Sequence, residues 1–181
     1  MRLSLLRSSL CATLLAATLL SGCAASTQQL SPSLKMVQSL PEAGGASSAS
    51  AELSAPVVMV HFFASWCTLC AFEFPHLAAL RANIPQDRLG IVAIAIDDNE
   101  EDVRRMLAKR QLPFAVLVDA GNSAKTAFAV SDLPTTVFVT TDGRPFEIRE
   151  AKSGKPLSRF EGAYEWGRGD ALAALEQALQ Q

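Results

Sequence analysis

Two cysteines separated by two residues are the feature that most constrains this chain. They lie in FFASWCTLCAFEFP, residues 62–75. The apolar run before them, VVMVHFF at 57–63, is typical of a strand buried on both faces. Residues 68–83 have the apolar spacing of a helix. Cys67 is therefore predicted at a helix N-terminus, where free N–H groups and the helix dipole lower the pKa of a thiol.

This spacing is what a two-step thiol–disulfide exchange needs. The thiolate of Cys67 would attack a disulfide, and Cys70, one helical turn later, would close the ring and release the product. A zinc site needs four ligands. The chain has only two histidines to add to the cysteine pair: His61, in the strand, and His76, off the cysteine face of the helix. A purely structural disulfide would remove little chain entropy from so short a loop. A redox centre without metal or dissociable cofactor is the favoured interpretation.

The rest of the chain alternates strand and helix signals, which predicts a central mixed β-sheet flanked by helices. Asn122 or Ser123 is expected to cap one helix and Asp170 the last. The Asp-Gly of TDGR predicts a hairpin. The expected strands are 57–63, 90–96, 114–119, 135–140 and 145–150, and the expected helices are 68–83, 97–111, 122–130 and 169–180.

The N-terminus has the pattern of an export signal. Residues 1–22 carry Arg2 and Arg7 near their start and continue into an apolar run that is short for a membrane span. LSGC, residues 20–23, resembles the lipobox of bacterial lipoproteins, which implies cleavage before Cys23 and a lipid anchor on that cysteine. An uncleaved signal anchor and an ordinary cleaved signal remain alternatives. Ala24, where an aspartate often signals inner-membrane retention, favours the outer membrane.

These assignments leave Cys67 and Cys70 as the thiols of a domain outside the cytosol, where disulfides persist. Residues 23–50, rich in Ala, Ser, Gln and Gly, are expected to form the lipidated N-terminus and a flexible tether, with LKMV at 34–37 as a candidate edge strand. The folded domain is expected at 51–181. A formal net charge of −2 and a pI near 5.7 give no reason to expect nucleic acid as a partner.

Two separated motifs resemble the thioredoxin superfamily, in particular its TlpA/ResA-like group of membrane-anchored thiol–disulfide oxidoreductases. The pattern W-C-x-x-C-x-x-E-x-P is matched by Trp66, Cys67, Cys70, Glu73 and Pro75. LPTT, residues 133–136, resembles the loop of that family that contains a cis-proline. The resemblance covers about residues 56–142. It implies a thioredoxin-like fold with the CxxC at a helix N-terminus, facing a cis-proline loop.

The resemblance also implies roles for individual residues. Cys67 would attack, Cys70 would resolve, and the two would form a disulfide when oxidised. Pro134 and Leu133 would border the substrate groove; the alternative is an ordinary trans turn proline. Trp66 would cover the rim of the site, or simply pack. Glu73 would influence proton transfer at the thiols, or be a solvated helix glutamate.

Two positions depart from the family pattern. His61 stands where thioredoxin has a buried aspartate, so it is either a proton shuttle or, the favoured interpretation, a satisfied core histidine. Leu69 replaces the proline usual before the second cysteine, which alters the redox potential in a direction that the sequence does not give.

The leading hypothesis is an exported, monomeric lipoprotein that faces the periplasm, reduces disulfides of client proteins and takes electrons from a membrane thiol donor. A thiol oxidant or isomerase of the same fold is one alternative, and a non-catalytic tethered binding module is another. A peroxidase is disfavoured because Ala64 occupies the position where peroxiredoxins carry a Thr or Ser, three residues before the cysteine.

Overall fold

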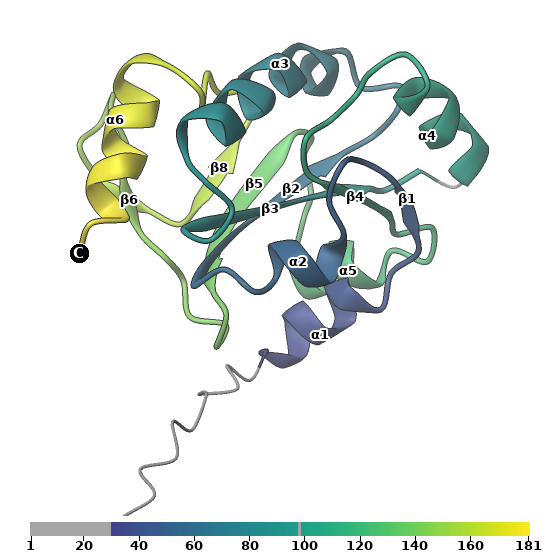
Figure 1. Cartoon of the computed structure of the whole chain (residues 1–181), viewed down its shortest axis with the longest axis horizontal. Helices are drawn as coiled ribbons and strands as arrows, with labels where there is room; N and C mark the ends of the chain where they lie inside the picture. The colour runs from purple at the N-terminus through teal and green to yellow at the C-terminus, as the bar shows by residue number, and fades with distance from the viewer. Residues whose placement is uncertain (1–29, 98) are drawn as a thin grey trace, which may run out of the picture.

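The computed structural model of the protein describes residues 30–97 and 99–181 (Figure 1). The expected signal at 1–22 and Cys23 lie outside the described residues. A six-stranded sheet has the order β1-β4-β3-β2-β5-β8, with a separate two-stranded β6-β7 hairpin. The strands are β1 Glu42–Gly44, β2 Val57–Phe63, β3 Leu89–Ala95, β4 Ala115–Val118, β5 Thr135–Thr140, β6 Ile148–Arg149, β7 Pro156–Leu157 and β8 Arg159–Glu161. The helices are α1 Pro32–Gln38, α2 Ala49–Glu52, α3 Thr68–Asn83, α4 Glu100–Leu107, α5 Ser123–Ala127 and α6 Gly169–Ala178.

The sheet is mixed, as predicted. Strands β2, β3 and β4 run parallel, whereas β5, β1 and β8 run antiparallel to their neighbours. Every residue of β2 and β3 is buried, because helices cover both faces of the sheet. Figure 1 shows α3, α4 and α6 on one face and α1, α2 and α5 on the other, and each layer has its own apolar core. The prediction of a thioredoxin-like α/β fold is confirmed.

The segment expected to be a flexible tether is part of the fold from residue 30 onward. Ser31 caps α1 with its hydroxyl and Pro32 opens the helix, so LKMV is helical and not an edge strand. Leu34 and Val37 lie on one helical face and are fully buried in the core below the sheet. Strand β1 then pairs with the edge of β4. The small-residue composition suggested a linker, but two apolar residues at helical spacing pack into the core and hold the segment against the sheet.

Helix caps also differ from those expected. The carboxylate of Asp119, not Asn122 or Ser123, accepts the N–H groups of Ser123 at 2.8 Å and Lys125 at 2.8 Å at the start of α5. Asn122 itself adopts a left-handed conformation with φ of 55° and makes no side-chain cap. The last helix is preceded by Arg168, so Asp170 lies in its first turn rather than at the cap.

The predicted hairpin after β5 forms only from its turn as far as Phe146, whose N–H donates to the carbonyl of Phe138 at 3.0 Å. The N–H of Thr140 donates to the carbonyl of Arg144 at 2.9 Å, and a single bridge joins Val139 and Pro145. The second arm then leaves the sheet, and its strand β6 pairs with β7. Strand β8 takes the edge of β5 instead, and this brings the C-terminal segment over α3.

No helix in the described ranges combines the length and apolar character that crossing a bilayer requires.

Candidate active site

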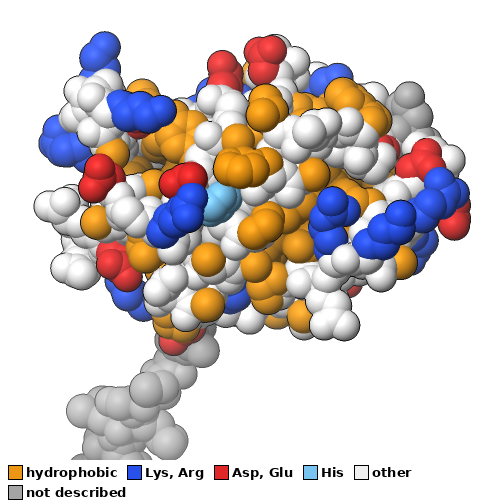
Figure 2. Space-filling view, turned by 90° about the horizontal axis from the view of Figure 1, so that it is seen from above, with side chains coloured by type: hydrophobic (Ala, Val, Ile, Leu, Met, Phe, Trp, Pro, Cys, Tyr) orange, Lys and Arg blue, Asp and Glu red, His pale blue; other side chains and the backbone are white. Residues whose placement is uncertain are grey.

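The molecular face that carries α3 exposes large apolar side chains beside the cysteines (Figure 2). Trp66 is 73% exposed, Leu69 57% and Phe72 56%. The alternative of Trp66 as a packing residue is therefore wrong. Leu69 and Phe72 lie one helical turn apart at the start of α3, and Trp66 precedes that turn. These three side chains are called the apolar strip below.

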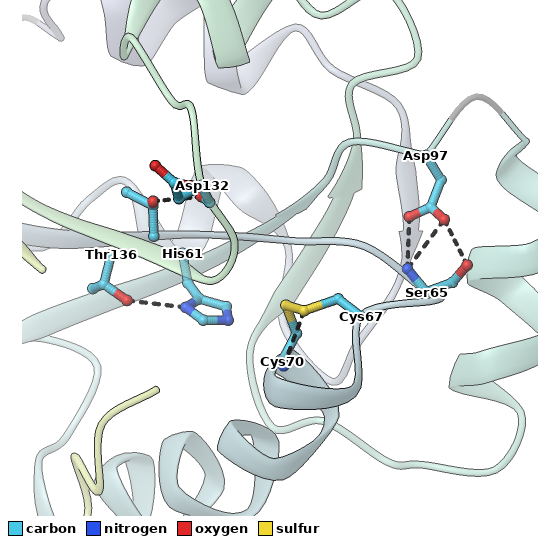
Figure 3. The surroundings of a disulfide bond; sticks show 8 residues. His61, Ser65, Cys67, Cys70, Asp97, Asp132 and Thr136 are labelled. Carbon is cyan, nitrogen blue, oxygen red and sulfur yellow. Dashed lines mark hydrogen bonds between the residues drawn. A yellow bond between two sulfur atoms is a disulfide. The ribbon is translucent and has the colours of Figure 1, made fainter. Parts of the chain in front are cut away.

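Cys67 and Cys70 form a disulfide at the N-terminus of α3 (Figure 3). Cys67 is the N-cap residue, and its Sγ accepts a hydrogen bond from the N–H of Cys70 at 3.1 Å. Cys67 retains 8% of its surface, whereas Cys70 is fully buried. Free N–H groups and the helix dipole at this position stabilise a thiolate on Cys67. Of the two cysteines, only Cys67 therefore reaches the molecular surface.

A carboxylate from the next strand holds the loop before Cys67. Asp97, at the end of β3, is 4% exposed and accepts the N–H of Ser65 at 2.9 and 3.1 Å and its hydroxyl at 2.5 Å. Sequence reasoning missed this contact, because Asp97 was assigned to the acidic start of the following helix. The signal available was an acid directly after a buried strand, at the edge of the sheet where the CxxC loop also begins.

The peptide bond between Leu133 and Pro134 is cis, so the trans alternative is wrong. In the antiparallel pair of β2 and β5, Phe62 lies opposite Thr135, which places Pro134 beside the end of β2. The loop is held by the N–H of Gly162, which donates to the carbonyl of Pro134 at 2.9 Å. Thr135 also donates its hydroxyl to the carbonyl of Asp132 at 2.7 Å. The register of the sheet thus brings the two sequence motifs to one edge.

His61 is fully buried beneath the disulfide. Its Nδ1 lies 3.0 Å from the hydroxyl of Thr136, and Figure 3 shows the opposite edge of the ring directed toward the cysteines. Nε2 has no hydrogen-bond partner among the described residues. Burial lowers the pKa of His61 to about 3, so the ring is neutral near pH 7. This favours a core histidine, packed against the rings of Phe63 and Phe74, but the unpaired Nε2 contradicts the expectation that its hydrogen bonds are satisfied.

Glu73 is fully buried, which overturns the alternative of a solvated helix glutamate. Burial raises the pKa of Glu73 to about 8, although a hydrogen bond from Trp166 opposes that rise. The Nε1–H of Trp166 donates to Oε1 of Glu73 at 2.6 Å. Trp166 is itself buried among Phe138, Phe160 and Tyr164. Sequence reasoning missed this contact, which spans 93 positions.

Comparison with known proteins places these features in a family context. The model of the AhpC/TSA family matches residues 32–144. The thiol-disulfide oxidoreductase ResA of Oceanobacillus iheyensis is 32% identical over 112 residues, which are 61% of this chain and 57% of that protein. ResA of Bacillus subtilis is 26% identical over 97 residues, or 54% of each chain. The chain thus spans little more than half the length of these curated relatives.

Solved structures show the same fold. A thiol:disulfide interchange protein DsbE from Chlorobium tepidum aligns with a TM-score of 0.60 and 24% identity, over 77% of this chain and 91% of that one. A secreted Mycobacterium tuberculosis disulfide oxidoreductase homologous to E. coli DsbE aligns with a TM-score of 0.54 and 20% identity, over 78% and 92%. With the fold, the CxxC pair and the family match in agreement, the chain belongs to the AhpC/TSA family of thioredoxin-like proteins.

Proposed function

We propose that this protein is an exported thiol–disulfide oxidoreductase that reduces disulfides of client proteins. The observation that carries the proposal is the asymmetry of the cysteine pair. Cys67 caps α3 and keeps a small exposed surface, 8% of the residue, while Cys70 is fully buried behind it. A pair arranged in this way can attack with one sulfur and resolve with the other. The similarity to ResA, a thiol-disulfide oxidoreductase, and to the thiol:disulfide interchange protein DsbE supports the same class of reaction.

The two cysteines supply both electrons that the reduction of a client disulfide needs. In the dithiol form, the Cys67 thiolate attacks one sulfur of a client disulfide, and a client thiolate leaves. The Cys70 thiolate then attacks Sγ of Cys67, which releases the second client thiolate and closes the Cys67–Cys70 disulfide. The client gains two electrons and the protein loses two. A membrane thiol donor then restores the dithiol by the same exchange in reverse.

Glu73 is proposed to hold and exchange the proton of Cys70. The two residues lie one turn apart on α3, and both are fully buried. A carboxyl with a pKa of about 8 exchanges a proton with a thiol, whose ordinary pKa is about 8.5, at little cost in free energy. An exposed glutamate with a pKa near 4.5 would not match a thiol in this way. The role of His61 as a shuttle is not proposed, because its ring does not charge near neutral pH.

Export and anchoring are part of the proposal and rest on the N-terminal sequence. The signal at 1–22 would be removed, and lipid on Cys23 would hold a monomer at the periplasmic side of a membrane, with Ala24 favouring the outer membrane. Residues 32–52, most of which were expected to belong to the tether, include α1, β1 and α2 and are part of the fold.

The first experiment is the reduction potential of the Cys67–Cys70 pair in the purified protein, equilibrated in graded thiol buffers. A value at or below that of thioredoxin, about −270 mV, is expected for a reductase. A value near that of DsbA, about −120 mV, would reverse the proposed electron flow and make the protein an oxidant or isomerase. A pair without any reversible couple would favour a binding module.

Cysteine variants test the order of the two steps. Cys70→Ser is expected to accumulate a mixed disulfide between Cys67 and a client, because the resolving thiol is missing. Cys67→Ser is expected to accumulate none, since Cys70 is buried. Both are read by non-reducing electrophoresis after acid quenching. Equal trapping by the two variants would contradict the assignment of Cys67 as the attacking residue.

A further inference from the structure

A groove of about 470 Å³ lies between the loop before Cys67 and helix α4. Trp66 and Ser65 form one wall, and Met106 is a buried residue of the α4 side. The remaining lining side chains are charged: Asp102, Arg105, Lys109 and Arg110. The groove adjoins the reactive loop, because Trp66 directly precedes Cys67.

The charge of this groove is unbalanced. Arg105 pairs with Asp102 at 2.7 Å, which is the one ion pair among the lining residues. Lys109 and Arg110 are exposed, and no described carboxylate lies within ion-pair distance of either. The whole chain has a formal net charge of −2. A local excess of cations beside the reactive cysteine is therefore a feature of this face and not of the protein as a whole.

The basic groove continues into the apolar strip of Trp66, Leu69 and Phe72. Figure 2 shows orange apolar side chains across the middle of this face, with blue basic side chains toward both ends and red acidic side chains among them. Trp66 belongs to both features, since it lines the groove and is 73% exposed. An exposed apolar patch with charge at its rim is the usual form of a protein-binding surface, where charge selects the partner and speeds encounter.

We propose that the basic groove and the apolar strip form one docking site for a client segment that is both acidic and apolar. The client cysteine would lie at Cys67, an aromatic or aliphatic residue would cover the strip, and an aspartate or glutamate would enter the groove beside Lys109 and Arg110. The occupant is a polypeptide segment of the disulfide-bearing client, chosen by charge complementarity and by continuity with the attacking sulfur. This inference rests on the proposed function and adds substrate selectivity to it.

The test uses three peptides that share one internal disulfide and one phenylalanine. They differ at two flanking positions, which carry aspartate, asparagine or lysine. The pre-reduced protein is mixed with each peptide, and the second-order rate of its oxidation is measured by acid quenching. The acidic peptide is expected to react roughly tenfold faster than the neutral one at about 30 mM salt, and the difference is expected to shrink at about 300 mM salt.

The double variant Lys109→Gln/Arg110→Gln is expected to bring the ratio of acidic to neutral rates close to one. A change in the reactivity of Cys67 itself would scale both rates and leave that ratio unchanged. The matched control is Lys152→Gln/Lys155→Gln, which removes the same charge from exposed positions near the β6–β7 hairpin and is expected to retain the ratio. Phe72→Ser tests the apolar strip. It is expected to slow the reaction of the phenylalanine peptides more than that of matching peptides in which serine replaces the phenylalanine.

Three results would overturn the docking site. They are equal rates of the wild-type protein with all three peptides, an acidic preference that survives in the Lys109→Gln/Arg110→Gln variant, and a loss of preference in the hairpin control. Reaction with the small neutral 2-hydroxyethyl disulfide distinguishes a failure of the docking site from a failure of the proposed function. If the compound oxidises the pre-reduced wild-type protein but the protein does not discriminate among the peptides, only the proposal of the docking site is wrong. If it reacts with no disulfide, the proposed function fails as well.

Discussion

At the residue scale, the contact between Glu73 and Trp166 decides how the buried carboxyl behaves. Burial disfavours the charged form of Glu73, while the indole N–H of Trp166 stabilises it. The indole is fixed in turn by its aromatic neighbours and by Gly167, where a Cβ atom would lie 2.5 Å from that of Ala79 in α3. The C-terminal segment therefore sets the protonation of a residue in the active-site helix.

Trp166→Phe is expected to raise the pKa of Glu73 above about 8, because phenylalanine keeps much of the packing but donates no hydrogen bond. The pKa is measured from the carboxyl resonance of Glu73 in a ¹³C NMR pH titration. Phe160→Leu, which alters the same aromatic cluster without touching the carboxyl, serves as control. A pKa that falls or stays constant in Trp166→Phe would contradict the role given to the indole.

The residues that sequence reasoning found and those it missed differ in how far their partners lie along the chain. Cys67, Cys70 and Glu73 fall within one local motif, so their spacing alone indicated a shared site. Asp97 and Trp166 reach that site only through the sheet register and the C-terminal crossing, 32 and 93 positions away from their partners. No local pattern encodes such contacts. The buried state of Glu73 was hidden for the same reason, because its cover comes from β8 and the segment after it.

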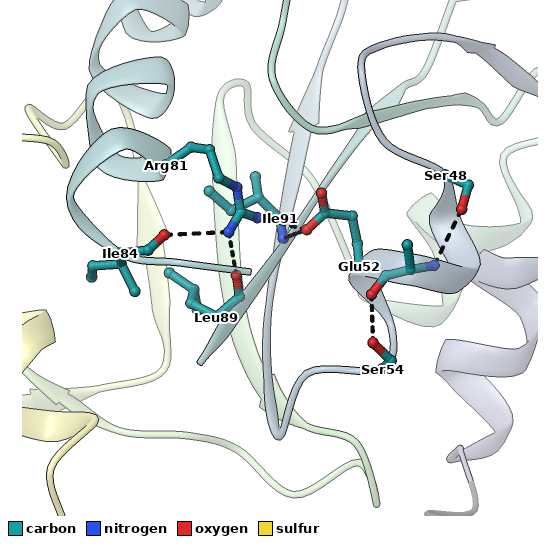
Figure 4. A network of polar contacts seen from close by, with 8 residues as sticks. Ser48, Glu52, Ser54, Arg81, Ile84, Leu89 and Ile91 are labelled. Carbon is teal, nitrogen blue, oxygen red and sulfur yellow. Dashed lines mark hydrogen bonds and ion pairs between the residues drawn. The ribbon is translucent and has the colours of Figure 1, made fainter. Parts of the chain in front are cut away.

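At the element scale, helix α2 is joined to the rest of the fold by a buried ion pair (Figure 4). Glu52, at its end, accepts from the guanidinium of Arg81 at 2.6 Å and from the N–H of Ile91 at 2.7 Å. Arg81 also donates to the carbonyl of Leu89 at 2.9 Å. A Cβ atom at Gly90 would lie 2.0 Å from the carbonyl oxygen of Glu52, so glycine permits this close approach. The four-residue helix thus depends on partners in α3 and β3.

Glu52→Ala is expected to lower the free energy of unfolding by about 3–5 kcal/mol, because it leaves the guanidinium of Arg81 partly buried without its anion. Chemical denaturation measures the change. Arg168→Ala removes one partner of an exposed ion pair with Glu165 and is expected to change the free energy of unfolding far less. Comparable losses in the two variants would show that the Glu52 pair is not a structural link.

The elements that could be predicted are those whose own sequence determines them. Strand β2 is a continuous apolar run, and α3 begins and ends within two residues of its predicted bounds. The segment from α1 to α2 could not be assigned, because its small polar residues become ordered only against β4, α5 and β3. The prediction that the second arm of the hairpin pairs along β5 was wrong for a related reason, because β8 occupies that edge of β5.

At the scale of the whole molecule, two buried titratable residues give stability opposite dependences on pH. Between about pH 4.5 and 8, the folded chain keeps a proton on Glu73 that the unfolded chain releases, so stability falls as pH rises through this window. Between about pH 3 and 6.5, the unfolded chain binds a proton on His61 that the folded chain lacks, so stability falls as pH falls. Where the windows overlap, the two slopes oppose each other, and we expect a broad maximum of stability there.

Glu73→Gln isolates one of these slopes, because an amide does not titrate but its oxygen still accepts the indole N–H. The difference in unfolding free energy between this variant and the wild-type protein is expected to be constant below pH 4.5, to rise in favour of the variant up to about pH 8, and then to level. The rise is at most about 4–5 kcal/mol, and relaxation of the buried site would reduce it.

The measurement is denaturant unfolding of the oxidised protein from pH 3 to pH 9. Glu147→Gln, at an exposed glutamate, is the matched control for the loss of one carboxylate. A Glu73→Gln curve that levels near pH 4.5 would mean that Glu73 ionises as an ordinary carboxyl in the folded protein. The proton exchange proposed between Glu73 and Cys70 would then lose its basis, whereas the exchange of sulfur at Cys67 would stand, because it depends on the position of that cysteine at the start of α3 and not on the carboxyl.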